Sequence, residues 1–378
     1  MTLAEIDLPR ATDGEIAAIN LESARRRAWV RFAQDPRRPG LAEELIDKER
    51  MAAQFLGDLD ALDRLEALAS QFTRADDSPR APLVQAEVAS TGHRFADARD
   101  HLARAALMGG PCEEIERNLL TFDQACGLKL DAVLAARRRL ATATGRIEDL
   151  VPLGAVLADL ERFAEADAVY RQAFYSYGDV SPFPLAWACF QLGMLWGELV
   201  PEPDANLAAL WYRRAISYLP GYVKARVHLA EIYTTQEQAG EAEALLAPVL
   251  SSRDPEVPWR FADLLILQER FEKAKTQLDV ARCRFNDLLN KHLLAFADHA
   301  AEFYASSGND RGRALELARA NVANRPTRRA VQQMDAIAAS VDEISAVATD
   351  STRPNEPPQT AAALKGRIES SLAVQSGR

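Results

Sequence analysis

Residues 148–173 read EDLVPLGAVLADLERFAEADAVYRQA, and this stretch decides the fold. Apolar residues recur every three or four positions in both halves, as they do on one face of an α-helix. The halves meet at a break near Arg162, and the second half places Ala166, Tyr170 and Ala173 on one face. The stretch therefore predicts two antiparallel helices joined by a short turn.

The pattern of the second helix recurs along the chain as a small residue, a large one four positions later and a small one three after that. Its leading residues are Ala98, Ala132, Ala166, Ala208, Ala242, Ala274 and Ala314. We expect the small residues at the helix crossing and the large one in the groove of the next pair. Because one helix pair cannot bury its apolar face alone, the pairs must stack. An all-α solenoid is the result.

The steps between these alanines are 34, 34, 42, 34, 32 and 40 residues. The copy at Ala132 and Ala136 is the weakest, because its third position would be Arg139. The 42-residue step contains extra residues in YGDVSPFP and ELVPEPDAN, and the 40-residue step lengthens a second helix through CRFNDLLNKHLLAF. Such insertions bend a solenoid locally or carry function.

The repeat resembles the tetratricopeptide family, whose signature has Leu-Gly and an aromatic in the first helix, Ala-x3-aromatic in the second and a closing Pro. The matching residues are Leu153, Gly154, Ala166, Tyr170 and Ala173; Leu192, Gly193, Trp196, Ala208, Tyr212, Ala215 and Pro220; and Leu229, Ala230, Tyr233, Ala242 and Leu246. The resemblance implies a right-handed superhelical solenoid of stacked antiparallel helix pairs. It also implies that the first helices line a concave groove that binds partner peptides.

Three regions follow from the pattern. Residues 1–40 form an N-terminal helix, over 14–33, and a linker. Residues 41–345 form the array of about seven or eight helix pairs, with the best copies in 148–252. Residues 346–378 contain a disordered linker, marked by DSTRPNEPPQT, and a short C-terminal helix.

The composition, with 48% hydrophobic and 26% charged residues, is that of a soluble folded protein. A net charge of -10 gives no overall attraction for nucleic acid, so a nucleic-acid partner is not expected. The N-terminus lacks the basic start and apolar run of a signal peptide, and no long apolar stretch predicts a membrane span. The cytoplasm is the expected compartment, and the few lysines beside many arginines and alanines indicate a bacterial source.

Familiar catalytic and cofactor-binding signatures are absent from the sequence. The four cysteines form no CxxC pair, and His292 and His299 lie seven residues apart, a poor spacing for metal ligands on one helix. We therefore expect no enzyme activity, no cofactor and no metal. The stretch LWYRRAISYLPGY at 210–222, rich in aromatic residues and arginine, is interpreted as packing within a repeat.

Alignment of the first helices on Gly154, Gly193, Ala230, Ala262 and Ala301 identifies the predicted groove positions. They are Phe190, Gln191, Met194, Lys224, His228, Glu231, Trp259, Arg260, Asp263, His299 and Glu302. The groove is predicted to be apolar around Phe190 and Met194 and charged further along. Acidic or apolar residues replace the asparagines with which chaperone adaptors of the family hold a terminal carboxylate, so a carboxylate clamp is not expected.

The predicted function is a non-catalytic scaffold or adaptor that binds a protein or peptide with an apolar anchor and basic residues. Double substitution of Phe190 and Trp259 by alanine is expected to abolish partner capture. The alternative is an enzyme, or an accessory subunit of one, with a groove site near His228, Glu231, Arg260 and His299. Neither the partner's identity nor the oligomeric state follows from the sequence.

Overall fold

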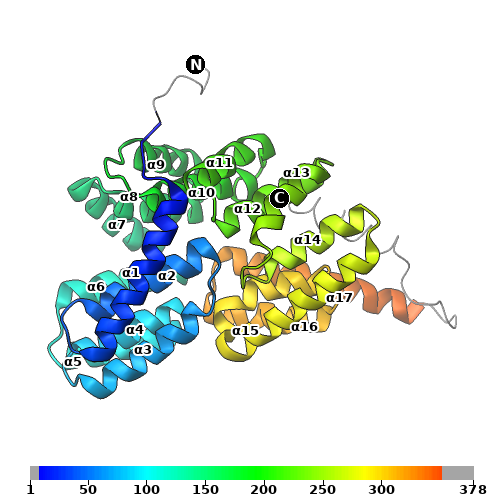
Figure 1. Cartoon of the computed structure of the whole chain (residues 1–378). Coiled ribbons are helices and arrows are strands. Elements are labelled where there is room, and N and C mark those ends of the chain that lie inside the picture. Colours follow the sequence, from blue (N-terminus) through cyan, green and yellow to red (C-terminus); the bar gives the residue numbers. More distant parts are fainter. Residues whose placement is uncertain (1–7, 351–378) are drawn as a thin grey trace.

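The structure is a computed structural model that describes residues 8–350, with the backbone alone for 342–350. Within this part of the chain the regular elements are all helices, so the all-α prediction is confirmed (Figure 1). The helices are α1 (Gly14–Gln34), α2 (Leu41–Leu56), α3 (Ala61–Ala75), α4 (Arg80–Thr91), α5 (Phe95–Leu107), α6 (Cys112–Ala125), α7 (Leu130–Thr144), α8 (Ile147–Asp159), α9 (Phe163–Tyr175), α10 (Pro182–Met194), α11 (Ala205–Tyr218), α12 (Val223–Thr235), α13 (Ala239–Leu246), α14 (Glu256–Leu267), α15 (Phe271–Ala305), α16 (Arg311–Asn324) and α17 (Arg328–Asp350).

Helix ends follow local sequence signals. The Asp13 carboxylate accepts hydrogen bonds from the backbone N–H groups of Glu15 and Ile16 and caps α1. Asp204 and Asp310 cap α11 and α16 in the same way. Gly145 ends α7 with a φ of 62°, a backbone conformation that glycine adopts without strain.

Small residues lie at the helix crossings, as the repeat pattern predicts. The leading alanines of α5, α9, α11, α13, α15 and α16 are all buried. A Cβ built on Gly154 would lie 2.4 Å from the Tyr170 ring, and one on Gly193 would lie 2.4 Å from the Tyr212 ring. The large residue thus lies over the glycine of its own pair, whereas we expected it in the next pair. Tyr212 does both, since its ring also stacks on His228 of α12.

The weak copy has a different register from the predicted one. Ala132 is exposed, and α7 buries Val133, Leu134, Arg137 and Ala141 instead. The Arg137 guanidinium donates to the Gln124 side-chain oxygen at 2.9 Å and to the Thr121 hydroxyl at 3.2 Å. A buried arginine therefore lies among the packing residues of α7, and α6 and α7 pack less closely than the other pairs.

Both irregular steps make long-range contacts. In the first, the Thr12 backbone N–H donates to the Val180 carbonyl at 2.7 Å, so the insertion before α10 holds the segment that leads into α1. In the second, α15 lengthens as predicted and then kinks at His292, where φ is -136° and ψ is 49°. The His292 ring nitrogen Nε2 lies 2.8 Å from the Asp63 carboxylate of α3.

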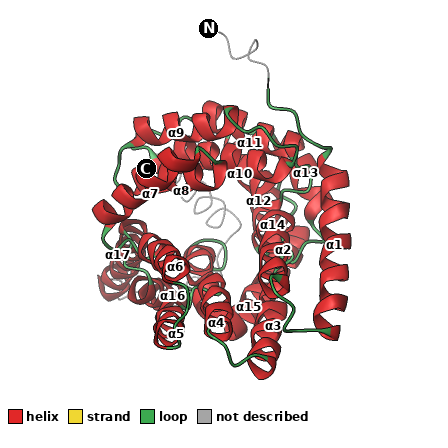
Figure 2. Ribbon diagram, turned by 90° about the vertical axis from the view of Figure 1, so that its left-hand side faces the viewer, coloured by secondary structure: helices red, strands yellow, loops and turns green. Residues whose placement is uncertain are grey.

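The array curves into a ring in which the C-terminal helices α16 and α17 reach back to the segments that follow α4, α8 and α10 (Figure 2). The Asn324 side chain donates to the His93 carbonyl at 2.9 Å, and Arg329 donates to Glu198 at 2.8 Å. Arg328 pairs with Glu161, which follows α8. Helices α8, α10 and α12 lie toward the inside of the ring, and α9, α11 and α13 lie outside.

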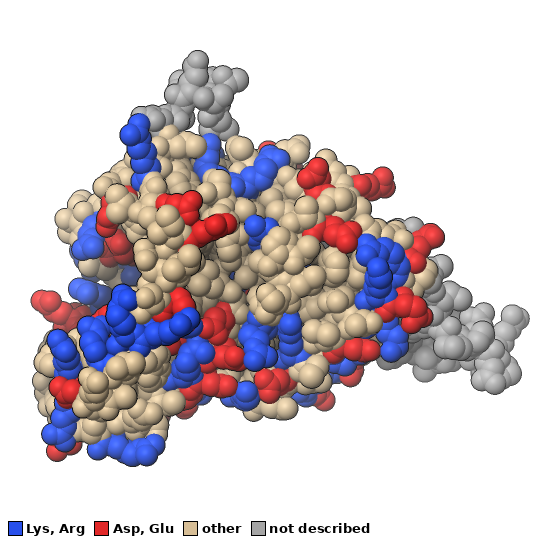
Figure 3. All heavy atoms as spheres, viewed as in Figure 1, with Lys and Arg blue, Asp and Glu red and all other residues tan. Residues whose placement is uncertain are grey.

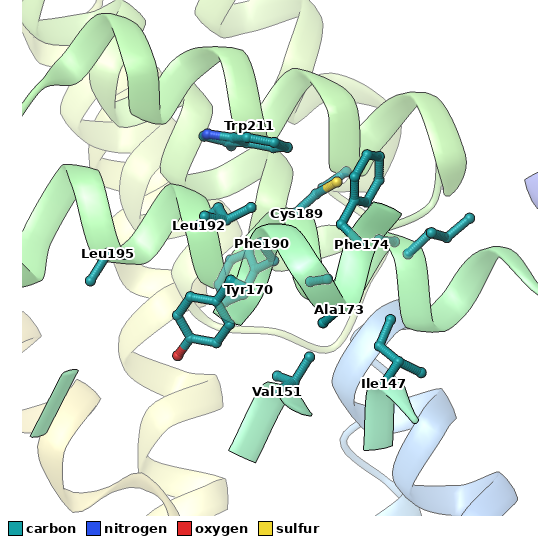
Figure 4. Close-up of a cluster of buried hydrophobic side chains, with 14 of the residues drawn as sticks. Ile147, Val151, Tyr170, Ala173, Phe174, Cys189, Phe190, Leu192, Leu195 and Trp211 are labelled. Atoms are coloured by element: carbon teal, nitrogen blue, oxygen red, sulfur yellow. The ribbon is translucent and has the colours of Figure 1, made fainter. Parts of the chain in front are cut away.

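The largest core cluster joins α7 through α12 with the first half of α1 and the end of α2. Figure 4 shows Trp211 of the 210–222 stretch above Cys189 and Phe174, within this core. The Arg214 guanidinium lies 4.8 Å from the Trp211 ring centroid. This stretch is therefore packing, as predicted. Helix α17 continues to Asp350, five residues past the predicted end of the array, and the predicted linker and C-terminal helix in 351–378 lie outside the described residues.

Candidate binding groove

Charged side chains from successive first helices meet in one row. The row begins at His228 on α12, whose Nδ1 lies 2.8 Å from Glu198 and 3.5 Å from Glu231. Glu231 lies 2.5 Å from the Nε of Arg260 on α14, an ion pair without hydrogen-bond alignment. The Nη2 of Arg260 lies 2.8 Å from the Oε1 of Glu302 on α15, and this ion pair extends the row. These predicted groove residues are therefore in direct contact.

Arg260 is the centre of this row. Besides Glu231 and Glu302, its guanidinium lies 3.6 Å from the Asp263 carboxylate. Asp263 in turn accepts a hydrogen bond from the Ser307 hydroxyl at 2.5 Å. The guanidinium also lies 3.6 Å from the Trp259 ring centroid, within cation–π range. Three carboxylates thus converge on one buried cation.

Burial perturbs the carboxyl groups unequally. It raises the pKa of Glu231 to about 7 and that of Asp263 to about 6, although Arg260 opposes both shifts. At Glu198 burial also favours the neutral form, but the charges of His228 and Arg329 outweigh it and lower the pKa to about 2. Ionised and protonated carboxyl groups therefore lie side by side near neutral pH.

His299 forms a second group at the end of the row. Its Nδ1 lies 2.7 Å from Glu256, and the neighbouring Asp298 pairs with Arg325 at 2.6 Å. Burial disfavours the imidazolium, but Asp298 and Glu256 outweigh burial and raise the pKa of His299 to about 9. His299 is therefore protonated at neutral pH. Lys224 lies near enough to this group to influence Asp254, Glu256 and His299 by its charge.

The predicted apolar anchors are corrected by the structure. Trp259 is 1% exposed, packs against Phe285 and Phe303, and donates its indole N–H to Ser307. Phe190 is 8% exposed and packs against Tyr212, Tyr222 and His228. Both rings are core residues because neighbouring repeats cover them. Substituting them with alanine would test folding and not partner capture. Gln191 and Met194 of α10 stay half-buried.

Sequence reasoning missed Glu198, Glu256 and Arg329. Glu198 lies in a π-helical turn, Leu195–Leu199, that extends α10 and brings its carboxylate to His228. Arg329 comes from α17, 131 residues away in sequence, and no local pattern marks it. Glu256 stands at the start of α14, where the alignment of first helices could have included it.

The described residues contain no group of three His, Cys, Asp or Glu side chains arranged to hold a metal ion. His292 and His299 have separate partners, Asp63 and Glu256. Among residues 8–350, none of the helices combines the length and the apolar composition that crossing a bilayer requires.

No protein-family profile matches the sequence, and no curated protein matches it. Several solved structures match the chain in fold. BtubC from P. vanneervenii is 16% identical, with 64% of this chain and 96% of that chain covered and a TM-score of 0.38. The apo form of the quorum sensor NprR from B. thuringiensis is 15% identical, with 80% and 85% covered and a TM-score of 0.44.

A tetratricopeptide repeat protein from Parabacteroides merdae is 13% identical, with 69% of this chain and 99% of that chain covered and a TM-score of 0.39. It carries the name of the family that the Leu-Gly and Ala-x3-aromatic motifs resemble.

Proposed function

We propose that this protein is a non-catalytic scaffold that binds a partner protein or peptide through the charged row on its first helices. The observation that carries the proposal is the convergence of Glu231, Asp263 and Glu302 on Arg260. Glu302 gives this cluster a partly exposed carboxylate at its edge, so a basic residue of a partner would meet complementary charge there. We place the protein in the bacterial cytoplasm.

The accessible end of this cluster is where a partner would make contact. Glu302 keeps 31% of its side chain exposed, whereas Arg260 and Asp263 are nearly covered. Met194 is the apolar groove residue that remains partly accessible, since Phe190 and Trp259 are buried. The partner is therefore expected to present basic residues, with a small apolar contact instead of a deep aromatic anchor.

A displayed peptide library selected on the immobilised protein would test this proposal. Peptides rich in Lys and Arg should emerge, and fluorescence anisotropy should show them binding Glu302→Lys about 10-fold more weakly or worse. Glu241→Lys is the control, because Glu241 is an exposed acid on α13, outside the ring. If every selected peptide binds the two variants equally, the groove is not the binding surface.

An enzyme, or an essential subunit of one, is the second candidate. It is favoured by the same convergence of ionisable groups and by the pKa of Glu231, which lies in the range useful for proton transfer. A thermal-shift screen of small metabolites would support it if a large shift in wild type is lost in Glu231→Gln. Unchanged shifts in that variant would exclude Glu231 as the site.

A further inference from the structure

Helix α1 has two apolar faces, and only one of them packs on the protein. Its inner face buries Ala17, Leu21, Ala28 and Phe32 against the array. Its outer face exposes Ile16 by 53%, Ile19 by 69% and Val30 by 60%. Single exposed apolar residues are ordinary, but these three share one helix and one side of it.

The outer face has the spacing of a helix-pairing seam. Positions 16, 19, 23, 26 and 30 alternate steps of three and four, which keeps them in one stripe along the helix. Ile16, Ile19 and Val30 occupy three of these positions, with Ser23 and Arg26 between them. Such a stripe fits the matching stripe of another helix at a shallow crossing angle.

The two halves of the stripe differ in charge and in side-chain type. Its first half carries the two isoleucines beside exposed Glu15, and its second half carries exposed Arg26 and Arg27. An open hollow of about 570 Å³ adjoins the second half, lined by Ala24, Arg26, Arg27, Val30, Arg31 and Glu44. Figure 3 shows Lys and Arg side chains gathered over the lower half of α1. One half thus offers apolar side chains and the other offers space for them.

We propose that two copies of this chain associate through the outer faces of α1, packed antiparallel about a two-fold axis. This direction brings the isoleucines of each copy to the hollow beside Val30 of the other, and Glu15 toward the other copy's arginines. A two-fold axis makes both contacts twice, as closed dimers require. A parallel pairing would instead oppose Arg26 and Arg27 with their own copies.

The position of α1 permits this contact. It lies along the outer edge of the ring in Figure 2, so closure of the array does not cover the stripe. One helix face is a small interface, so the association should be weak and depend on concentration. It is expected to appear between about 10 and 300 µM, and to leave the groove on the first helices accessible.

Sedimentation velocity over this concentration range tests the dimer. Wild type should shift from 41.6 kDa toward twice that mass. Ile19→Arg should raise the dissociation constant about 10-fold or more, because it faces the partner's arginines. Ile19→Glu should do less harm, since the same arginines attract it. Leu107→Arg, at an 89% exposed residue of α5, is the control and should change nothing.

Three other outcomes would contradict the proposal. Wild type that stays monomeric at about 300 µM excludes the dimer. Equal loss in Ile19→Arg and Ile19→Glu excludes the antiparallel direction. Binding of monomeric protein to vesicles of anionic lipid, lost in Ile19→Glu, would assign the stripe to a membrane surface instead. Far-UV circular dichroism melts of all variants verify that they fold.

Discussion

At the residue scale, two glycines set how closely the helices of a pair approach. Gly154 and Gly193 each lie under a tyrosine of the following helix, at a distance that leaves no room for a methyl group. The Leu-Gly motif was readable in the sequence for this reason, because a close crossing demands a residue without a side chain. The same reasoning did not find the buried Arg137, since a charged residue at a packing position depends on its hydrogen-bond partners Gln124 and Thr121.

Gly193→Ala should lower the free energy of unfolding by about 1–3 kcal/mol, because the new Cβ would lie 2.4 Å from the Tyr212 ring and force a shift of the ring or the helix. Gly240→Ala is the matched control. A Cβ there meets nothing within 4 Å, and alanine favours the helix, so stability should rise slightly. Urea unfolding of both variants measures the difference, and equal stabilities would contradict the close crossing.

At the element scale, the charged row on the first helices depends on how α12, α14 and the second half of α15 are aligned with one another. The alignment of first helices grouped His228, Glu231, Arg260 and Glu302, which contact one another in sequence order because equivalent positions of stacked repeats lie side by side. It could not tell which of them the next repeat covers. Trp259 occupies such a position but points into the core between α14 and α15, where Phe285 and Phe303 surround it.

The pH dependence of stability should report Glu231. Burial raises its pKa from 4.5 to about 7, so between these values the folded protein holds a proton that the unfolded chain has released. The free energy of unfolding should therefore fall as the pH rises through this window, with Asp263 contributing in the lower part. Glu231→Gln should flatten the slope, measured by urea unfolding at steps of pH.

His299→Gln serves as the comparison for this experiment. The pKa of His299 is raised from 6.5 to about 9, so its stabilising contribution is complete below 6.5 and is lost as the pH rises to about 9. This variant should flatten the slope in the upper window alone. If the free energy of unfolding of Glu231→Gln fell between pH 4.5 and 7 as steeply as that of wild type, the pKa of Glu231 would not be raised.

At the scale of the whole molecule, contacts between distant segments close the array. Asn324 and His93 are 231 residues apart, His292 and Asp63 are 229 apart, and Arg329 and Glu198 are 131 apart. The insertions of the two irregular steps take part in these contacts. Their lengths were readable in the sequence, but the segments that they meet were not.

Reversing the charges of Arg328 and Arg329 to glutamate should loosen the closure. Each would repel its acidic partner, Glu161 or Glu198, whereas removal of one surface pair alone would have a small effect. Small-angle X-ray scattering should show a larger radius of gyration than for wild type. Arg319→Glu, at an exposed position of α16, should leave the radius unchanged. An unchanged radius in the double variant would mean that other contacts hold the ring.

The sequence by itself determined the helix pairs and their stacking, because glycine, alanine and tyrosine at fixed spacing act through neighbours within one repeat. It also determined which positions share the first-helix surface. The tertiary structure decided which of those positions stay accessible, and it joined Glu198 and Arg329 to His228. The contact between Arg329 and Glu198 joins segments 131 residues apart. No periodic sequence pattern predicts such long-range contacts, since they depend on the summed curvature of all the helix pairs that lie between the two segments.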